Sequence, residues 1–483
     1  MNFATPVFLF VFFPITVLFY FIEVFLECRK ILGVFLVKLR IKDIIIVCLS
    51  LGFYMWACFD DVFKLCIYIF MVWMLGYGIT LGQRYKRTLG HVLFIMACLV
   101  VVYELVYFKY TNFFVDIWNS LFQKSIARRG ILAPLGISFI TFSSLSYLID
   151  IYRKDAERGS LIDCALYLSF FPKVISGPIV LWKDFQPLIK ERVIKIDCFV
   201  RGLNGIMIGF AKKLILADQF GACISQISEN GVDIVTAWGT SLLYMLQIYY
   251  DFSGYSDIAI GLARLLGFEF KENFSFPYRS VSISEFWRRW HISLGTWFRE
   301  YIYIPLGGSR NGRFQTLRNL AVVFITTGIW HGAGWNYIIW GGINGFCVIF
   351  ERIIRDKKLY HILPDMVKWI TTMGITLFSW QFFRFQNITE VWNWMKVMFG
   401  VFQFDIIPYS WQYYFDMKIV TLIVIGIFGS TLFGSEKIGD LSQKIFLSKV
   451  GFVVKELCLL ILFIMSILFM VNSTYSPFIY FQY

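Results

Sequence analysis

The sequence from Phe324 to Gly345 reads FITTGIWHGAGWNYIIWGGING. It lies inside a longer segment, residues 319–350, that contains no Lys, Arg, Asp or Glu. A helix of about 20 apolar residues crosses the hydrocarbon core of a bilayer, so this segment predicts a membrane span. His331, one of only four histidines in the chain, stands near its middle. Because a polar side chain is costly in lipid, this imidazole requires a structural or functional explanation.

The composition of the whole chain favours an all-α polytopic membrane protein. Of 483 residues, 58% are hydrophobic and 16% are charged, whereas a soluble protein has about 25% charged residues. The net charge of +13 does not indicate nucleic-acid binding, since membrane proteins collect Lys and Arg in cytoplasmic loops. The ten cysteines stand singly without a C-x-x-C pair, which indicates neither a disulfide framework nor a zinc site.

Hydropathy predicts about eleven or twelve helical elements. The first 22 residues are uncharged and too long for a signal peptide, so an uncleaved first helix is expected. The stretches 161–181 and 234–267 contain Pro, Gly or charge and are expected to be broken or re-entrant. The other predicted elements are 43–59, 62–82, 89–108, 131–149, 200–225, 319–350, 367–385, 417–435 and 453–472.

Basic residues predict the orientation in the membrane. They cluster in residues 29–42, 84–87 and 153–158, whereas Asp60 and Asp61 lie in an intervening turn. Loops rich in Lys and Arg stay in the cytoplasm, so these three loops are expected inside and the N-terminus outside. The loop 109–130, with Arg128 and Arg129, is a mild exception to this pattern.

The most polar long segment, residues 271–318, alternates arginine with aromatic residues in SISEFWRRWHISLGTWFREYIYI. One interpretation is an interfacial amphipathic helix that anchors the protein, with rings at headgroup level. The other is a mouth that attracts a phosphate-bearing donor through Arg288 and Arg289, because the guanidinium fork matches phosphate. Ser282 is expected to cap a helix here, with Glu285 three positions later. Residues 270–308 are expected to lie at the cytoplasmic surface as short helices, rather than as a full span.

Two carboxylates interrupt the apolar sequence YYDFSGYSDIAIGLARLLGF, at Asp251 and Asp257. A carboxylate within a membrane usually faces a cavity or a partner. Pairing with an arginine that holds helices together is one interpretation, and a substrate-binding role is the other.

His331 is a candidate catalytic base. The glycines around it, Gly328, Gly332 and Gly334, suggest space for a substrate to approach the ring. A neutral imidazole accepts a proton near neutral pH. The chain has no G-x-S-x-G sequence, so direct transfer to an activated hydroxyl is favoured over a covalent acyl-enzyme.

Five motifs together are similar to bacterial membrane-bound O-acyltransferases, and to the alginate type among them. They are PKVISGPI, YYDFSGYSDIAIGLARLLGF, NFSFPYRSVSISEFWRRWHISLGTWFREYIYIPLGG, WHGAGWNYIIWGGING and STYSPFIYFQY, over about residues 172–483. The resemblance implies a ring of about 11–12 tilted transmembrane or re-entrant helices around a central tunnel. It also implies that His331 and His291 are the catalytic histidines.

The same resemblance implies the substrates, partners and location. The acyl donor would be acetyl-CoA or an acyl carrier thioester, with no bound cofactor. Extracytoplasmic proteins that modify a polysaccharide would be the partners, and the bacterial cytoplasmic membrane the location. The residues expected to bind substrate are Asp251, Asp257, Arg288, Arg289, Trp290, Trp330, Trp335 and Asn336.

Two alternatives stay open at the level of sequence. One is a D-alanyl transfer protein of teichoic acid modification, which uses an aminoacyl carrier protein. The other is a transporter of lipid-linked sugars, although a transporter would favour paired broken helices in two similar halves, and no such halves are visible. The chain is expected to form one domain, with N-terminal helices to residue 160, a core at 161–350 and C-terminal helices at 351–483.

Overall fold

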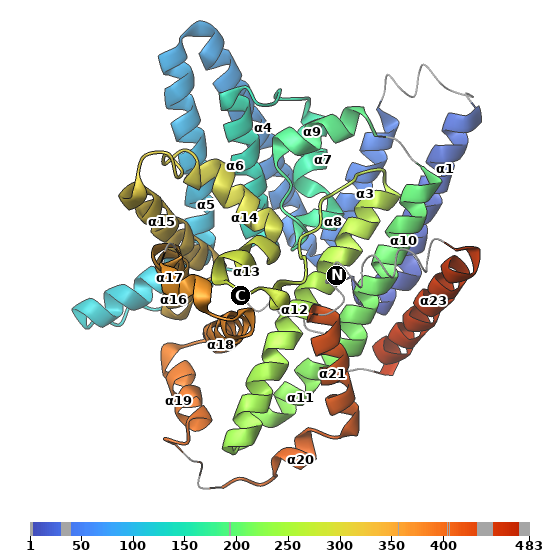
Figure 1. Ribbon diagram of the computed structural model, residues 1–483. Helices are drawn as coiled ribbons and strands as arrows, with labels where there is room; N and C mark the ends of the chain where they lie inside the picture. Colours follow the sequence, from blue (N-terminus) through green and yellow to red (C-terminus); the bar gives the residue numbers. More distant parts are fainter. Residues whose placement is uncertain are drawn as a thin grey trace. The chain divides into compact units, whose positions relative to one another are not determined.

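The fold is built from helices (Figure 1). The computed structural model describes residues 3–29, 40–192, 195–355, 357–402, 404, 406–431 and 448–472, and every regular element among them is a helix. The motif STYSPFIYFQY and most of the basic loop 29–42 lie outside these residues. The all-α class predicted from the sequence is confirmed.

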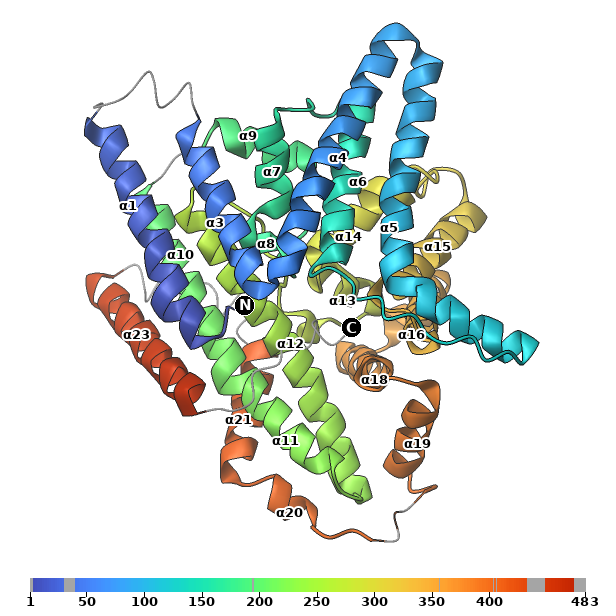
Figure 2. The same cartoon turned by 180° about the vertical axis from the view of Figure 1, so that it is seen from behind.

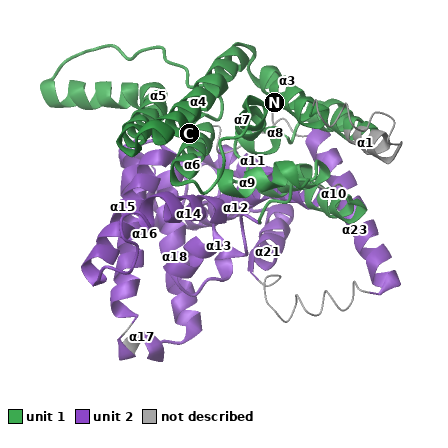
Figure 3. Cartoon of the chain, turned by 90° about the horizontal axis from the view of Figure 1, so that it is seen from above, with its two compact units in different colours: residues 1–206, 256–271 green, residues 207–255, 272–483 purple. Residues whose placement is uncertain are grey.

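The helices divide between two compact units, which are coloured separately in Figure 3. Unit 1 comprises residues 1–206 and 256–271, and unit 2 comprises residues 207–255 and 272–483. The helices that begin in unit 1 are η1 (Phe8–Phe12), α1 (Phe13–Arg29), α3 (Ile41–Ala57), α4 (Phe59–Tyr85), α5 (Arg87–Phe122), α6 (Ile137–Arg153), α7 (Leu161–Ser169), α8 (Phe171–Val174), α9 (Trp182–Lys190) and α10 (Ile196–Phe210).

Unit 2 contains the segments in which both candidate histidines lie. Its helices are η2 (Ala211–Ala217), α11 (Asp218–Ser228), most of α12 (Ile234–Leu265), η3 (Pro277–Arg279), α13 (Ile283–Arg289), α14 (Ile292–Phe298), η4 (Arg299–Tyr303), α15 (Arg313–His331), α16 (Trp335–Ile354), α17 (Lys358–Ile362), α18 (Asp365–Arg384), α19 (Ile388–Met398), α20 (Trp411–Tyr414), α21 (Met417–Thr431) and α23 (Lys449–Asn472).

Several of these helices suit a bilayer. Among the described residues, α4, α5, α16 and α23 are long and apolar enough to cross a membrane, and Phe8–Phe19 and Met417–Thr431 are shorter apolar helices. The protein is therefore an all-α polytopic membrane protein. The tunnel, the ring of 11–12 elements and the single domain stay predictions.

Unit 1 is organised around the antiparallel pair α4 and α5, which Figure 2 shows as the two longest helices of that unit. The pair turns at Lys86, whose backbone is extended. At the turn the helices approach so closely that a Cβ on Gly90 would lie 2.8 Å from the backbone nitrogen of Gln83. Further along unit 1, after α6, helix α7 begins with a capping box between Ser160 and Asp163, which satisfies two free N–H groups at its start.

Two expectations about the apolar stretches are wrong. Residues 319–350 form two helices, α15 and α16, which pack as an antiparallel hairpin. A single helix of that length would measure about 48 Å at 1.5 Å per residue, well beyond the hydrocarbon core. The stretch 234–267, expected to be interrupted, is instead the continuous helix α12, because none of its glycines or carboxylates removes a backbone N–H as proline does. The predicted break in 161–181 is confirmed, as α7 ends at Ser169 and α8 is only four residues long.

Candidate active site

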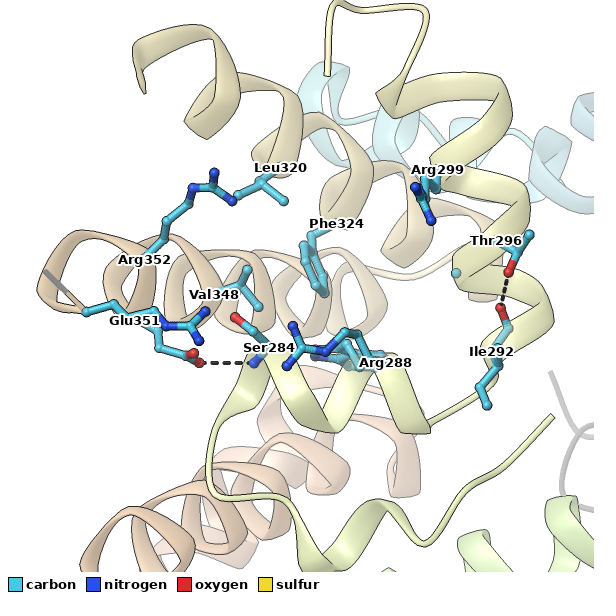
Figure 4. Close-up of a pocket in the computed structure, with 13 residues that line it drawn as sticks. Ser284, Arg288, Ile292, Thr296, Arg299, Leu320, Phe324, Val348, Glu351 and Arg352 are labelled. Atoms are coloured by element: carbon cyan, nitrogen blue, oxygen red, sulfur yellow. Dashed lines mark hydrogen bonds between the residues drawn. The ribbon is translucent and has the colours of Figure 1, made fainter. Parts of the chain in front are cut away.

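The arginine-rich segment forms a wall of a cavity in unit 2 (Figure 4). As predicted, it consists of short helices, η3, α13, α14 and η4. Ser282 caps α13 by accepting a hydrogen bond from the Glu285 backbone N–H at 3.1 Å. The Glu351 carboxylate, from α16, accepts a second bond from the Ser284 N–H at 3.0 Å. These two acceptors satisfy N–H groups that the start of a helix leaves free, and they fix α13 against α16.

The cavity has a volume of about 820 Å³ and a positively charged lining. It is lined by Ser284, Trp287, Arg288, Ile292, Gly295, Thr296, Arg299, Leu320, Phe324, Val348, Glu351, Arg352 and Arg355. Four arginines thus face one carboxylate, and that carboxylate bonds the Ser284 N–H. Uncompensated arginines around one space attract an anion, above all phosphate, which the guanidinium fork binds through two parallel hydrogen bonds.

Arg288 and Arg289, which the sequence predicted together as phosphate ligands, have different contacts in the structure. Arg289 is paired with Glu285 at 2.9 Å and also donates to the Ser275 carbonyl at 3.2 Å. Arg288 lines the cavity; like those of Arg299, Arg352 and Arg355, its side chain has no hydrogen bond or ion pair with another described residue. Arg288 is therefore available to a ligand, whereas Arg289 holds α13 to the chain before it.

Two helix faces lead from the cavity toward His331. On α15, Leu320 and Phe324 line the cavity, and His331 follows at a spacing that keeps it on the same face. The distance along the helix axis from Phe324 to His331 is about 10 Å at 1.5 Å per residue. On α16, Val348 and Arg355 line the cavity, and Trp340 shares their face. The hairpin therefore has the cavity near its open end and the histidine at its tip.

Aromatic contacts connect the same two places. Trp287, in the wall of the cavity, packs edge-on against Trp340 with ring centres 5.4 Å apart. Trp340 in turn packs edge-on against His331 at 5.1 Å. Two tryptophan rings thus lie between the arginine-lined space and the imidazole.

His331 is the last residue of α15 and is 6% exposed. Its ring contacts Trp330 at 4.7 Å and Phe383 at 4.9 Å, in addition to Trp340. Aromatic rings thus shield the imidazole from solvent, and a histidine acts as a base through its neutral form.

The glycines around His331 have a different role from the one expected. A Cβ on Gly332 would lie 2.1 Å from the Tyr337 ring, and one on Gly328 would lie 2.4 Å from the Tyr337 carbonyl oxygen. One on Gly334 would lie 2.4 Å from Asn336 Oδ1. Protein atoms fill the space beside these glycines, so they permit the tight turn between α15 and α16 and the close approach of the two helices.

His291 is held in one orientation by Asn273. The Asn273 side-chain oxygen accepts bonds from the Ser293 backbone N–H at 3.1 Å and from Ser293 Oγ at 2.9 Å, and it lies 3.1 Å from His291 Nδ1. Since the Ser293 N–H is a donor, it identifies the atom it contacts as the amide oxygen. His291 Nδ1 must then bear the hydrogen and donate it, which leaves the lone pair on Nε2.

The Nε2 atom of His291 is buried and has no hydrogen-bond partner among the described residues. The residue is 1% exposed, in a left-handed backbone conformation with φ of 46°. Its ring packs edge-on against Phe252 at 4.7 Å. Burial lowers the pKa of His291 to about 3, because a low-dielectric environment disfavours the charged imidazolium.

Asp251 forms part of a buried ion cluster. Lys213 Nζ lies 2.6 Å from Asp251 and 2.7 Å from Asp218, and each of the three side chains is 2% exposed. The carboxylate therefore has a cationic partner, as the structural interpretation expected, but the partner is a lysine from the π-helical turn η2 and not an arginine. Asp257, by contrast, belongs to unit 1.

The remaining predicted site residues are mostly packing residues. Asn336 donates from Nδ2 to the carbonyls of Phe382 and Phe385, each at 3.0 Å, and so ties the start of α16 to the end of α18. Trp290 is buried and packs on Trp380 at 4.8 Å. Trp330 contacts the His331 ring, whereas Trp335 is 54% exposed.

Among the charged residues of the cavity that sequence reasoning missed, three lie together at the end of α16: Glu351, Arg352 and Arg355. A signal was present, since Glu351 and Arg352 follow the uncharged segment 319–350 directly and Arg355 lies one helical turn after Glu351. They became part of the site only because the hairpin brings the end of α16 beside α13, as the Glu351 to Ser284 hydrogen bond shows.

This arrangement defines a class of protein, an all-α membrane protein with an arginine-lined cavity leading toward a buried histidine. The family model of the membrane-bound O-acyltransferase family matches residues 43–361. The chain is 34% identical to the probable alginate O-acetylase of Pseudomonas aeruginosa, over the full length of both proteins. It is 32% identical to the peptidoglycan O-acetyltransferase of Helicobacter pylori, over 83% of this chain and 80% of that protein.

A third relative, the teichoic acid D-alanyltransferase of Streptococcus thermophilus, is 30% identical over 51% of this chain and 66% of its own length. The chain belongs to the membrane-bound O-acyltransferase family. It is an O-acyltransferase, as the sequence motifs indicated.

Proposed function

We propose that this membrane O-acetyltransferase takes an acetyl group from a thioester donor whose phosphates bind at Arg288, Arg299, Arg352 and Arg355. His331 would act as the base that activates the acceptor hydroxyl. The observation that supports this most directly is the cavity itself. It is surrounded by four arginine side chains that have no hydrogen bond or ion pair with any described residue, and its wall connects to His331 through Trp287 and Trp340.

The proposed reaction is a direct displacement at the thioester carbonyl. The acceptor hydroxyl oxygen forms a bond to the carbonyl carbon while its proton passes to the His331 imidazole. The tetrahedral intermediate then expels the donor sulfur, which takes up the proton, and the neutral imidazole is restored. A thioester is already activated, so positioning, a base and exclusion of water are the main requirements. Base catalysis of this kind typically contributes about 10²–10⁴-fold.

His291 would have a supporting role as a hydrogen-bond acceptor. Because Asn273 fixes the hydrogen on Nδ1, the buried Nε2 atom presents a lone pair. A lone pair accepts a bond from a hydroxyl or an amide N–H, but it does not stabilise a developing negative charge. This geometry therefore favours contact with the acceptor hydroxyl or with an amide of the donor arm.

The acceptor is proposed to be an extracytoplasmic polysaccharide. The names of the two O-acetyl relatives that match over most of this chain refer to alginate and to peptidoglycan, both of which contain polysaccharide. Transfer would start at the cytoplasmic side of the bacterial cytoplasmic membrane, where the basic loops predict the arginine segment to lie. Extracytoplasmic proteins would pass the acetyl group to the polymer. D-alanyl transfer is less favoured, because that relative matches about half of the chain.

Two adjacent arginines provide a matched test of donor binding. A hydrogen bond between charged groups is worth about 1.5–3 kcal/mol, and the lower value suits a cavity open to solvent. Arg288→Ala should therefore raise the acetyl-CoA concentration for half-maximal transfer about 10-fold, while the maximal rate changes little. Arg289→Ala removes a partly exposed i,i+4 pair worth about 0.3–0.5 kcal/mol, and its donor dependence should stay normal.

The measurement is labelled acetyl transfer by purified protein in proteoliposomes, titrated with acetyl-CoA and, separately, with an acetylated carrier protein. Equal donor dependence for wild type and Arg288→Ala, with both proteins monodisperse, would remove the cavity from donor binding. A normal response to one donor only would identify which thioester is used.

A further inference from the structure

The end of α5 forms a separate feature of unit 1. The helix has 36 residues and is about 54 Å long at 1.5 Å per residue, whereas the hydrocarbon core is about 30 Å thick. Figures 1 and 2 both show its last part turning away from the direction of its first part. The arm is defined here as residues 111–129, which comprise this last part of α5 and the chain that returns beside it.

The polar face of the arm is occupied by its own returning chain. Asn112 exchanges two hydrogen bonds with the Arg129 backbone, at 3.0 and 2.9 Å. Asn119 exchanges two with the Ile126 backbone, at 2.8 and 2.9 Å. Between them, Arg128 binds Asp116 through two parallel bonds of 2.9 and 2.7 Å. Six side-chain hydrogen bonds thus fix the arm as a rigid unit and use its polar side chains at positions 112, 116 and 119.

The opposite face is apolar and exposed. Phe114, Trp118, Leu121 and Phe122 are 51–71% exposed. Phe114, Trp118 and Leu121 each lie two residues after one of the polar positions 112, 116 and 119. Two residues correspond to about 200° around the helix, so the apolar and polar side chains lie on opposite sides. This face continues the exposed apolar side chains of the membrane-spanning part of α5, among them Leu99, Tyr103 and Tyr107.

We infer that the arm lies on the membrane surface, with Phe114, Trp118, Leu121 and Phe122 inserted between lipid headgroups. Three observations identify lipid as the occupant. The face continues the exposed apolar surface of the membrane-spanning part of the same helix, it carries a tryptophan, which favours the interface, and the cations Lys124 and Arg129 of the returning chain are exposed. A rigid helix with one apolar face and basic neighbours is typical of interfacial binding. By the charge pattern of the loops, this surface is the outer leaflet.

The arrangement also explains why Arg128 and Arg129 depart from the loop-charge pattern. Arg128 neutralises Asp116 within the arm, and the Arg129 backbone holds Asn112. Both arginines belong to a surface element, so neither marks a cytoplasmic loop.

The test places a fluorescent amino acid at Trp118 and, in a second variant, at Ser120, which is exposed on a different side of the same turn. Each variant is reconstituted alone into vesicles, so that no other protein can cover the arm. Lipids with brominated acyl chains should quench the probe at 118 several-fold more than at 120. Aqueous iodide should show the opposite preference.

A probe at Leu121 provides a second position on the apolar face, in case replacement of Trp118 lowers the yield of monodisperse protein. Equal quenching by iodide at 118, 121 and 120, with no effect of brominated lipid, would overturn the inference. The arm would then stand in water, and a protein partner would become the occupant to seek.

Discussion

Replacing Lys213 by Met tests whether Asp251 is structural or catalytic. The substitution keeps a flexible side chain of similar length but leaves Asp218 and Asp251 buried, at 2% exposure each, without their common cation. Breaking a buried ion pair from one side costs about 3–5 kcal/mol. Two lost charged hydrogen bonds, at about 1.5–3 kcal/mol each, give a similar figure. For a unit of this size, about 2 °C per kcal/mol predicts a fall of about 6–10 °C in the melting temperature.

The assay is thermal unfolding in detergent, followed by size-exclusion chromatography of the remaining protein. Lys190→Met is the matched control, since it breaks a surface pair with Glu157 whose side chains are 66% and 81% exposed, and such pairs contribute about 0–1 kcal/mol. The triple variant Lys213→Met, Asp218→Asn, Asp251→Asn should recover much of the loss, because no uncompensated charge stays buried. A Lys213→Met protein as stable as Lys190→Met but inactive in transfer would refute the structural role and return Asp251 to the reaction.

Two further predictions concern the hairpin and His291. Gly341→Ala should lower the melting temperature, because the new Cβ would lie 2.4 Å from the Phe324 carbonyl oxygen and overpacking costs about 1–3 kcal/mol. The adjacent Gly342→Ala meets nothing within 4 Å and should be neutral or stabilising; equal losses for the two would contradict the close packing of α15 and α16. Burial lowers the pKa of His291 in the folded state to about 3, whereas the unfolded residue titrates near 6.5. Between pH 3 and pH 6.5 the imidazole is therefore protonated in the unfolded state and neutral in the folded state. Stability should therefore fall as pH decreases from about 6.5, by up to about 1.4 kcal/mol per pH unit, and His291→Gln should reduce that slope; an unchanged slope would contradict the burial of the imidazole.

Most of the helices could be predicted from hydropathy alone. The stretches 62–82, 367–385 and 453–472 correspond to α4, α18 and α23, because each is one apolar run bounded by charge. The hairpin in 319–350 was missed, although its length and the Gly332-Ala333-Gly334 sequence were visible. An uncharged run reports burial in lipid or protein, and it does not distinguish one helix from two that pack on each other.

The site was predictable only in part. The sequence pointed to His331 because an intramembrane histidine is costly and stands out, to Arg288 through its place in the arginine cluster, and to His291 only through the family resemblance. The pair of Glu285 and Arg289 was visible as an i,i+4 spacing and was overlooked, whereas Lys213 as the partner of Asp251 depends on helix contacts that no local pattern shows. The role of Gly332 was misread for the same reason, as its neighbour Tyr337 lies five residues away across a turn.

The central proposal is that His331 accepts the proton of the acceptor hydroxyl. The most direct measurement is acetyl transfer by His331→Gln, made together with the monodisperse yield and acetyl-CoA binding of the same preparation. Glutamine keeps polar character and hydrogen-bonding capacity but does not take up a proton at neutral pH. The proposal predicts folded protein that binds the donor and forms product at least about 100-fold more slowly than wild type. Folded His331→Gln with near-normal transfer would contradict it and would leave His291 as the candidate base.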